Sequence, residues 1–587
     1  MSKFEESNFY KALQDFFINA DKKTFLQFLA EFYNRTEGII DKDNIQDDLI
    51  KELRELYLEF NEKGIDENIV REKVNYFLEN NIKIKDIISK LTTNTNNIEN
   101  INSQLDNIDK YNNTINLEKL GIISENVVYN DETNKYVMTD ITDIINNAIN
   151  QNCDILIFPS GNFCIEGQVI IDRPLSIIGN NTNIYTSPTA TSKRVFQFKN
   201  SNSSIQGFNF FSKNKYLTSL NDPDRTAFSS NVCSIDVIGE NQKNINISNC
   251  YFEGMGLGVS LQYTSNVNID NCISFECFFP IYTGLYSKNI TIKNCSLSCQ
   301  VETDLYGHVL YFADTSSNIL VDNCILKSLG KNTNNIIKCG SNTGNSSNVN
   351  IRNTLIECSV LSTLFYVHQN GDLTLYNCKI IANSLSGYTR LLQIGDNSSF
   401  KAYNCEFVLD SFERYTQAFN LNNTHVLFES SKIIIKNTYQ TYCNMPFVSG
   451  SETFNFKNCT IDLNIDRGFN LLSPEHRSLV LENCNININN KVITCGIYNS
   501  ADVRYTKTSS PILKMYNTNI FNNSANEMGS SAFFMNIVKD STTTPTCLLS
   551  NVTLYKCTGT SGGNNGKLFM TNAETQYIKN NVIDINP

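Results

Sequence analysis

Hydrophobic and polar residues alternate along most of this chain, in short runs that are interrupted at regular intervals. In residues 477–488 (RSLVLENCNINI), Leu479 and Leu481 precede an Asn-Cys pair, and Ile486 and Ile488 follow it. A period of two predicts β-strands with one buried face. The alternation shifts by one residue at the Asn, which indicates that the chain turns there.

The Asn-Cys arrangement recurs at intervals of 22 to 34 residues, which is the period of a solenoid. Asn adopts the left-handed conformation more readily than any residue except Gly, and its amide can bond to the Asn of the next coil, about 4.8 Å away. The Cys after it is expected to point into the core as a small polarizable side chain. We expect bends at Asn249, Asn271, Asn294, Asn323, Asn353, Asn377, Asn404, Ser430, Asn458, Asn483, Asn517, Asn551 and Asn580.

These repeats predict a mainly β fold, a single-stranded parallel β-helix over residues 183–587, in which the recurrent Asn and Cys are architecture and not ligands. Residues 117–182 are expected to form its entry and N-terminal cap. Within them, TDITDIINNAINQN (139–152) predicts a short helix that covers the open end of the β-helix, and residues 154–181 predict strands separated by a Pro-Ser-Gly turn.

Residues 1–80 have a helical period, with apolar residues on one face in three successive segments. They predict a small helical domain. In residues 81–116 the period becomes 3.5, which predicts a short coiled coil. Its core of Leu and Ile favours three or four strands, and Asn94 would fix the register, so we expect a homotrimer. One long amphipathic helix packed on its own chain is the alternative.

The entry segment, IFPSGNFCI followed by LSIIGNN, resembles that of pectate-lyase-like right-handed β-helices, particularly bacteriophage tail spikes and neck appendages. The resemblance covers residues 120–587 as architecture. It implies a right-handed β-helix and a phage tail protein attached to the virion through its N-terminal helical domain, with other tail or neck proteins as partners. Many such spikes end in a further domain; here the last repeat runs almost to Pro587, and we expect processing, trimer contacts or a second protein to account for that end.

Composition narrows the choice of partner. The chain has 48 basic and 59 acidic residues, so its net charge of −11 argues against nucleic acid as a partner and requires any anionic polymer to be held by local groups. Trp is absent while Tyr is plentiful, so stacking on sugars would use Tyr. We see no secretion signal and no long apolar run, and therefore expect no membrane insertion, synthesis in the host cytoplasm and location in the virion.

Metal and cofactor sites are not expected. The 19 Cys fall mostly at repeat positions that point inward, their number is odd, and no Cys-x-x-Cys pair occurs, so we interpret them as free thiols. The four His lie one to a coil, which is a poor arrangement for zinc.

One strand per coil can be aligned between residues 307 and 425, and its outward positions share a chemical character. They carry aromatic rings for stacking on sugars, amides for hydroxyl groups and a Lys for a phosphate or carboxylate. We predict that a sugar polymer binds there; the alternative is an ordinary solvated sheet face. The predicted binding residues are Tyr311, Lys338, Tyr366, His368, Gln393 and Asn420.

Four carboxylates near this strip are candidates for catalysis: Glu302, Asp304, Asp314 and Asp396. Glycoside hydrolysis uses two carboxyl groups about 5 to 9.5 Å apart, and residues one or two coils apart meet that requirement. An acidic β-helix also offers such pairs by chance. The signatures of polygalacturonases and the calcium cluster of pectate lyases are absent, so their chemistry does not carry over.

The leading hypothesis is therefore a trimeric phage tail appendage that attaches the virion to a host cell-wall polymer or surface polysaccharide. A virion-associated depolymerase, acting as a glycoside hydrolase, lyase or teichoic-acid-cleaving enzyme, would share fold and location. A bacterial surface adhesin is the third hypothesis. Whether the chain is an enzyme stays open at this point.

Overall fold

The chain divides into two units, Met1–Asn112 and Asn113–Pro587. The computed structural model describes, within the second unit, residues 113–213, 232–284, 286–299, 307–313, 316–329, 333–340, 347–358, 363–383, 390–410, 424–436, 442–444, 453–464, 468–472, 478–489, 495–499, 512–523, 533–536, 546–555, 567–570 and 576–585. The predicted helical domain and residues 81–112 of the predicted coiled coil lie outside them. Residues 114–116 of that interval form a strand.

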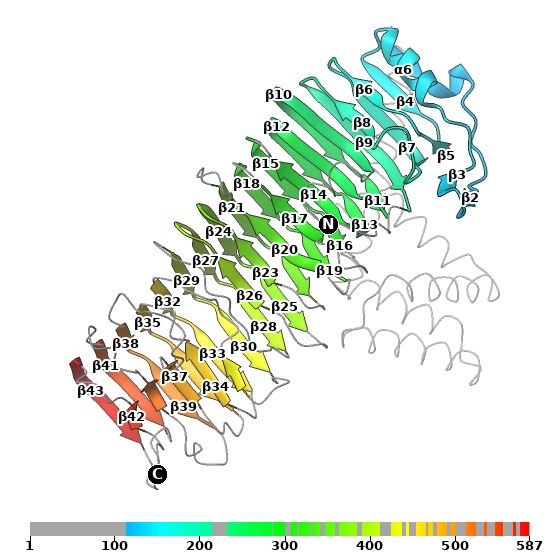
Figure 1. The fold of residues 1–587 in the computed structure, drawn as a ribbon. Coiled ribbons are helices and arrows are strands. Elements are labelled where there is room, and N and C mark those ends of the chain that lie inside the picture. The colour runs from blue at the N-terminus through cyan, green and yellow to red at the C-terminus, as the bar shows by residue number, and fades with distance from the viewer. Residues whose placement is uncertain are drawn as a thin grey trace, which may run out of the picture. The chain divides into compact units, whose positions relative to one another are not determined.

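The first coil is entered through a segment of short strands and two short helices. Strand β1 (Thr114–Asn116) pairs with β4 and is followed by the 3-10 helix η1 (Leu117–Leu120), the hairpin β2 (Tyr129–Asn130) and β3 (Lys135–Tyr136), and α6 (Thr142–Asn150). Ile145, Ala148 and Ile149 of α6 are buried in the same core as the first strands. The helix predicted for the cap is thus present, at the end of the β-helix where the described chain begins (Figure 1).

From β4 onward most of the described strands belong to three parallel ladders, which together form a β-helix (Figure 1). The pre-bend ladder ends at the recurrent Asn. It contains β4 (Ile155–Phe158), β7 (Ser176–Tyr185), β9 (Ser203–Phe211), β10 (Cys233–Ser248), β12 (Leu257–Asp270), β15 (Lys288–Lys293), β18 (Ser317–Asp322), β21 (Ser347–Arg352), β24 (Gly371–Tyr376), β27 (Ser399–Tyr403), β29 (His425–Glu429), β32 (Thr453–Lys457), β35 (Ser478–Glu482), β38 (Ile512–Tyr516), β41 (Thr546–Tyr555) and β43 (Gln576–Ile585).

The post-bend ladder follows the Asn, and several long strands, such as β7, β9 and β41, continue through the bend and belong to both ladders. Its other members are β5 (Gly161–Cys164), β11 (Tyr251–Glu253), β13 (Ile273–Cys277), β16 (Ser296–Cys299), β19 (Ile325–Ser328), β22 (Leu355–Cys358), β25 (Lys379–Asn383), β28 (Glu406–Asp410), β30 (Lys432–Lys436), β33 (Thr460–Asn464), β36 (Asn485–Ile488) and β39 (Asn519–Asn522).

The third ladder includes the first halves of β10 and β12. Its other strands are β6 (Val169–Ile171), β8 (Arg194–Phe198), β14 (Phe279–Gly284), β17 (Gly307–Phe312), β20 (Thr333–Cys339), β23 (Thr363–Val367) and β26 (Arg390–Ile394). A separate parallel sheet lies at the corresponding place in later coils and contains β31 (Tyr442–Asn444), β34 (Gly468–Leu472), β37 (Cys495–Asn499), β40 (Phe533–Asn536) and β42 (Lys567–Met570).

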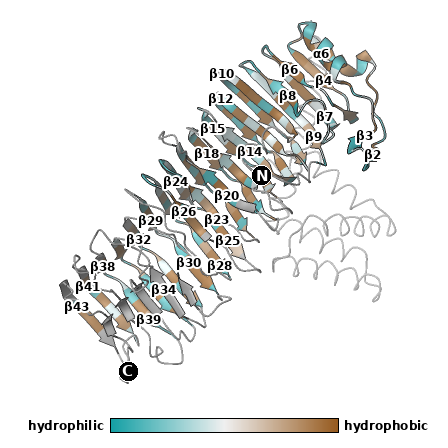
Figure 2. Cartoon of the chain, in the orientation of Figure 1, coloured by the Kyte–Doolittle hydropathy of each residue, from teal (hydrophilic) through white to brown (hydrophobic). Residues whose placement is uncertain are grey.

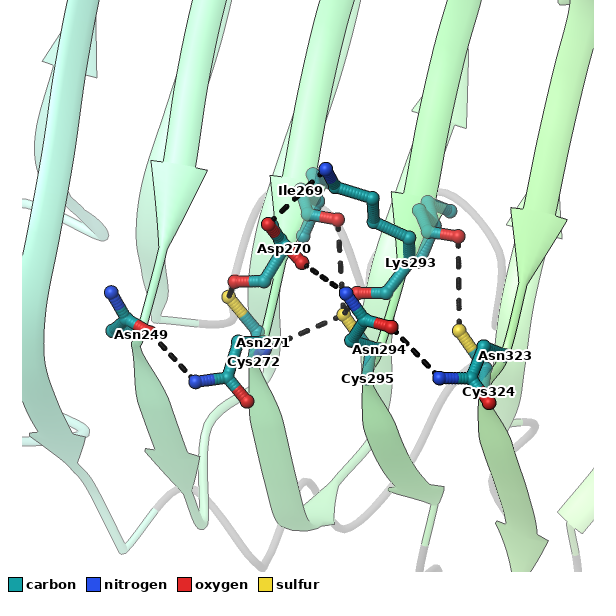
Figure 3. A network of polar contacts seen from close by, with 11 residues as sticks. Asn249, Ile269, Asp270, Asn271, Cys272, Lys293, Asn294, Cys295, Asn323 and Cys324 are labelled. Carbon is teal, nitrogen blue, oxygen red and sulfur yellow. Dashed lines mark hydrogen bonds and ion pairs between the residues drawn. The ribbon is translucent and has the colours of Figure 1, made fainter. Parts of the chain in front are cut away.

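The predicted bends have the predicted conformation. All of them from Asn249 to Asn551, Ser430 included, have a positive φ. Their amides bond from coil to coil: Nδ2 of Asn271 donates to Oδ1 of Asn249 at 2.7 Å, and that of Asn323 to Asn294 at 2.8 Å (Figure 3). Asn294 instead donates to Asp270, the residue before the bend at Asn271, so the ladder shifts by one residue between these two coils.

The last predicted bend is wrong by one residue. The turn lies at Asn581, with φ of 51°, and not at Asn580. Asn580 stands opposite Ser550 in the ladder, and Asn581 donates to Asn551 at 2.9 Å. Two adjacent asparagines are equally able to turn, so the choice is made by the register of the preceding coil.

The Cys residues after the bends point inward and are buried, as predicted, but they also donate hydrogen bonds. The Cys295 thiol donates to the carbonyl of Lys293 at 3.1 Å (Figure 3). Where the position is Thr or Ser, the hydroxyl makes the same bond two residues back, as Thr354 does to Arg352 at 2.8 Å and Thr518 to Tyr516 at 2.9 Å. At most bends the position therefore carries a small donor, and not only a small apolar group; Val552, after Asn551, is an exception.

The core fills the interior of the coils. Inward residues of all three ladders are buried, and Phe side chains stack between coils, as Phe210 does on Phe252 at 5.5 Å between ring centres. The alternation of brown and teal along the strands in Figure 2 is the period-two pattern of the sequence. Burial of the inward face of the three ladders supplies most of the driving force for this fold.

Candidate functional site

The third ladder brings a set of polar side chains into one line on its outward face. Strand register pairs each of them with the next, coil after coil. We call this set the polar column; it consists of Gln197, Asp236, Ser260, Tyr282, Tyr311, Lys338, Tyr366 and Gln393.

Four predicted binding residues therefore lie side by side. Tyr311, Lys338, Tyr366 and Gln393 occupy neighbouring strands β17, β20, β23 and β26 and are half-buried. Inward neighbours such as Leu310 are fully buried, as the alternation predicts. The contribution of the four predicted residues to binding stays a prediction.

This outward face is not simply solvated sheet. Two positions before the four half-buried members of the column, on the same side of each strand, the chain places apolar residues that are 0% exposed: Val309, Ile336, Leu364 and Leu391. Part of the outward face is thus covered, and the half-buried residues of the polar column lie at the margin of the covered part.

Lys338 lies between two aromatic rings of the column. Its Nζ is 4.5 Å from the centre of the Tyr311 ring and 5.8 Å from that of Tyr366. An aromatic ring attracts a cation over its face by about 0.5–1 kcal/mol at exposed sites and about 2 kcal/mol where water is excluded. Tyr311 is itself fixed by an edge contact with Tyr282 at 5.4 Å. The ammonium group is thereby held in a defined place.

His308 lies beneath this cluster and is completely buried. Its ring is 5.0 Å from that of Tyr311 and 5.6 Å from that of Phe279. Neither ring nitrogen has a well-formed hydrogen bond within the part of the chain that the structure describes. Burial, and then the charge of Lys338, lower the pKa of His308 well below its ordinary value, while the backbone of Asn335 opposes the shift. The imidazole is therefore neutral.

His368 and Asp396, both predicted site residues, lie in turns that stack on one another. The backbone N–H of Gln369 donates to Nδ1 of His368 at 2.8 Å, and that of Asn370 donates to the carbonyl of Asp396 at 2.9 Å. The His368 ring is 5.2 Å from that of Tyr366, so it extends the aromatic part of the column. Gly395 fits here because a Cβ would lie 2.8 Å from the nitrogen of Gln369.

The other end of the polar column is buried and contains a carboxylate. Gln197, Asp236, Ser260 and Tyr282 are 9%, 1%, 0% and 7% exposed. Oδ2 of Asp236 accepts from Nε2 of Gln197 at 2.8 Å and lies 3.6 Å from Nε of Arg194. Oδ1 has no hydrogen-bond partner among the described residues.

The remaining predicted residues cannot be placed. Glu302, Asp304, Asp314 and Asn420 lie outside the described residues, so the pairing of the candidate carboxylates is not tested and stays a prediction. The four members of the column before Tyr311 are not among the residues predicted from the sequence. The signal for Asp236 and Ser260 is present in CSIDVIG and GVSLQY, where single polar residues alternate with buried ones.

The described residues contain neither a candidate metal cluster nor a helix that could span a membrane. They contain no cluster of three or more His, Cys, Asp or Glu side chains suited to a metal ion. Their single α-helix, α6, is too short to cross a membrane, and no other described helix qualifies.

No family model matches the chain, and no curated protein matches it. Solved structures do resemble it. ORF18 of Geobacillus virus E2 is 16% identical with a TM-score of 0.33, and the match covers 64% of this chain and 64% of ORF18. PfbA, a surface adhesin of Streptococcus pneumoniae, is 13% identical, with coverages of 70% and 91% and a TM-score of 0.38. The tailspike protein gp49 of Acinetobacter baumannii bacteriophage Fri1, a capsular polysaccharide depolymerase, is 11% identical, with coverages of 71% and 64% and a TM-score of 0.35.

Proposed function

We propose that this protein is a phage tail appendage that attaches the virion to a cell-wall polymer or surface polysaccharide of the host. The observation that carries the proposal is the half-buried part of the polar column, where two Tyr rings, a Lys and an amide occupy consecutive coils. Rings that stack on sugars and amides that bond to hydroxyl groups are the usual components of a carbohydrate site.

A rigid sheet supports this use of the column. Side chains on neighbouring strands of a parallel sheet are held at fixed spacings, so binding costs little ordering of the protein. The apolar residues beside the column exclude water from one side of it. A polymer that runs along the β-helix would contact every member in turn.

The proposal extends to the handedness of the β-helix, the oligomeric state and attachment to the virion. The β-helix is right-handed, as crossover connections between parallel strands almost always are. Three copies associate through the coiled coil that the sequence predicts, and the N-terminal helical domain binds other tail or neck proteins of the virion. Light scattering on the purified full chain tests the trimer directly, since a monomeric mass would exclude it.

The function is tested by sedimentation of the purified protein with cell walls and capsules from a panel of bacteria. We expect binding to some of these preparations, reduced by Tyr366→Ala. The matched control is Tyr403→Ala, which removes a half-buried tyrosine on the pre-bend ladder that stacks on Tyr376. Equal binding by both variants would contradict a role for the column.

Cleavage of the polymer is the second candidate function, and Asp236 is the observation that favours it. A buried carboxylate with one unbonded oxygen is costly to maintain, and such groups cluster at functional sites. The same preparations are therefore assayed for released oligomers. Release that disappears in Asp236→Asn, while binding persists, would identify a depolymerase; binding without release would leave an attachment protein.

A further inference from the structure

In the polar column, the ammonium group of Lys338 lies between the rings of Tyr311 and Tyr366. Adjacent coils are about 4.8 Å apart. Tyr311 and Tyr366 are therefore about 10 Å apart along the β-helix, with Lys338 halfway between them. A polymer extended along the column would place one unit over each ring and the linkage or substituent between those units at the ammonium group.

We propose that the polar column recognises a polymer with an anionic group, phosphate or carboxylate, between two of its ring-stacking units, and that Lys338 binds this group. The inference rests on the proposed function and adds the charge of the ligand to it. Tyr311 and Tyr366 have two tasks, since they stack on the flanking units and hold the ammonium group in place between them.

Three features favour an anion at Lys338 over a purely structural cation–π contact. The whole chain is acidic, so it offers no long-range attraction to an anionic polymer and needs a local cation. The covered residues Val309 and Ile336 flank the site, and electrostatic attraction is stronger beside apolar groups than in open water. The imidazole of His308 below is neutral, so it does not compete with Lys338 for the anion.

The test compares defined polymers as well as cell walls. The full chain is titrated with poly(glycerol phosphate), with polygalacturonate and with neutral dextran, and with any cell wall that it binds. We expect binding to one of the anionic polymers and none to dextran, with an affinity that falls as salt rises. Competition by glycerol phosphate or by galacturonate then distinguishes a phosphate site from a carboxylate site.

Variants at Lys338 identify the group responsible. Lys338→Met keeps the apolar stem and removes the charge, so affinity should fall about 10- to 100-fold, as for loss of a charged hydrogen bond. Lys338→Arg should retain most of it. Lys401→Met, a half-buried lysine of β27 on the pre-bend ladder, is the control and should bind as the wild type does. Circular dichroism of each variant verifies the fold.

The outcomes separate this inference from the function on which it rests. Binding to dextran alone, or unchanged binding of any polymer or cell wall by Lys338→Met, would overturn the anionic ligand and leave attachment in place. A folded wild-type protein that binds none of the polymers or cell walls would overturn both. Loss of cell-wall binding in Lys338→Met, with no loss in Lys401→Met, supports both the anionic ligand and the attachment function.

Discussion

Replacing Asn483 tests how much a single bend stabilises the β-helix. Its φ is 54°, its Nδ2 donates to Asn458 at 3.0 Å, and its Oδ1 accepts from Asn517 at 3.0 Å. Ala loses both bonds, at about 0.5–1.5 kcal/mol each, and lacks the local side-chain hydrogen bonding that offsets the left-handed conformation in Asn, which adds about 1–2 kcal/mol. We therefore expect Asn483→Ala to lower the free energy of unfolding by about 2–5 kcal/mol.

Asn483→Gly separates the two causes. Gly loses the same two bonds but adopts a positive φ without strain, and part of that gain is offset by its larger entropy in the unfolded chain, so it should be about 1 kcal/mol less harmful than Ala. Asn404 donates to Asn377 at 2.8 Å but faces Ser430 in the next coil, so Asn404→Gly should cost about half as much as Asn483→Gly.

Denaturant unfolding measures these differences, followed by circular dichroism or Tyr fluorescence because the chain has no Trp. The m-value must stay constant across the series for the midpoints to be compared. A Gly variant as damaging as the Ala variant would refute the role assigned to φ. Equal losses at Asn404 and Asn483 would refute the contribution of the ladder.

Three further outcomes follow from buried groups. The pKa of His308 is lowered in the folded protein, so below pH 6.5, about the pKa of a His in the unfolded chain, the unfolded chain binds more protons than the folded protein does. The free energy of unfolding should therefore fall on acidification by up to about 1.4 kcal/mol per pH unit. Unfolding of His308→Phe from pH 7 to 5 should lack this component, and an unchanged slope would contradict it. Thr518→Val removes the bond to the Tyr516 carbonyl and should cost about 1–3 kcal/mol, while Thr518→Cys should restore most of it in the same unfolding assay. Burial raises the pKa of Cys277 to about 12, so mass spectrometry should find this thiol unlabelled by iodoacetamide in the folded protein and labelled after unfolding; rapid native labelling would show that the coil opens.

The β-helix could be predicted because its signals are local and repeated. Alternation defines the strands, and the bend needs a residue that tolerates positive φ, so each Asn from Asn249 to Asn551 was assigned its place. The error at Asn580 shows the limit of this reasoning: with two adjacent asparagines, only the pairing of Val552 with Val582 in the neighbouring coil selects the turn. The donor role of the Cys was missed for a related reason, since its acceptor is a carbonyl at the bend that sequence does not display.

The candidate site was only half predictable. The alternation gave the outward positions from Tyr311 to Gln393, because an aligned strand recurs there in each coil. Asp236 was not recognised, since its strand continues without a break into the pre-bend ladder. The burial of His308 was equally invisible, because it depends on Phe279 in the preceding coil and on covered residues around it.

The direction of the backbone hydrogen bonds has a mechanical consequence. Bonds between parallel strands of successive coils run along the axis of the β-helix, and the described coils are joined through the pre-bend and post-bend ladders and, as far as β26, through the third ladder as well. Tension along that axis is therefore shared among many bonds at every level, which must break together for two coils to separate. When the β-helix is pulled along this axis, the load is therefore carried by the backbone and not by the side chains of the polar column.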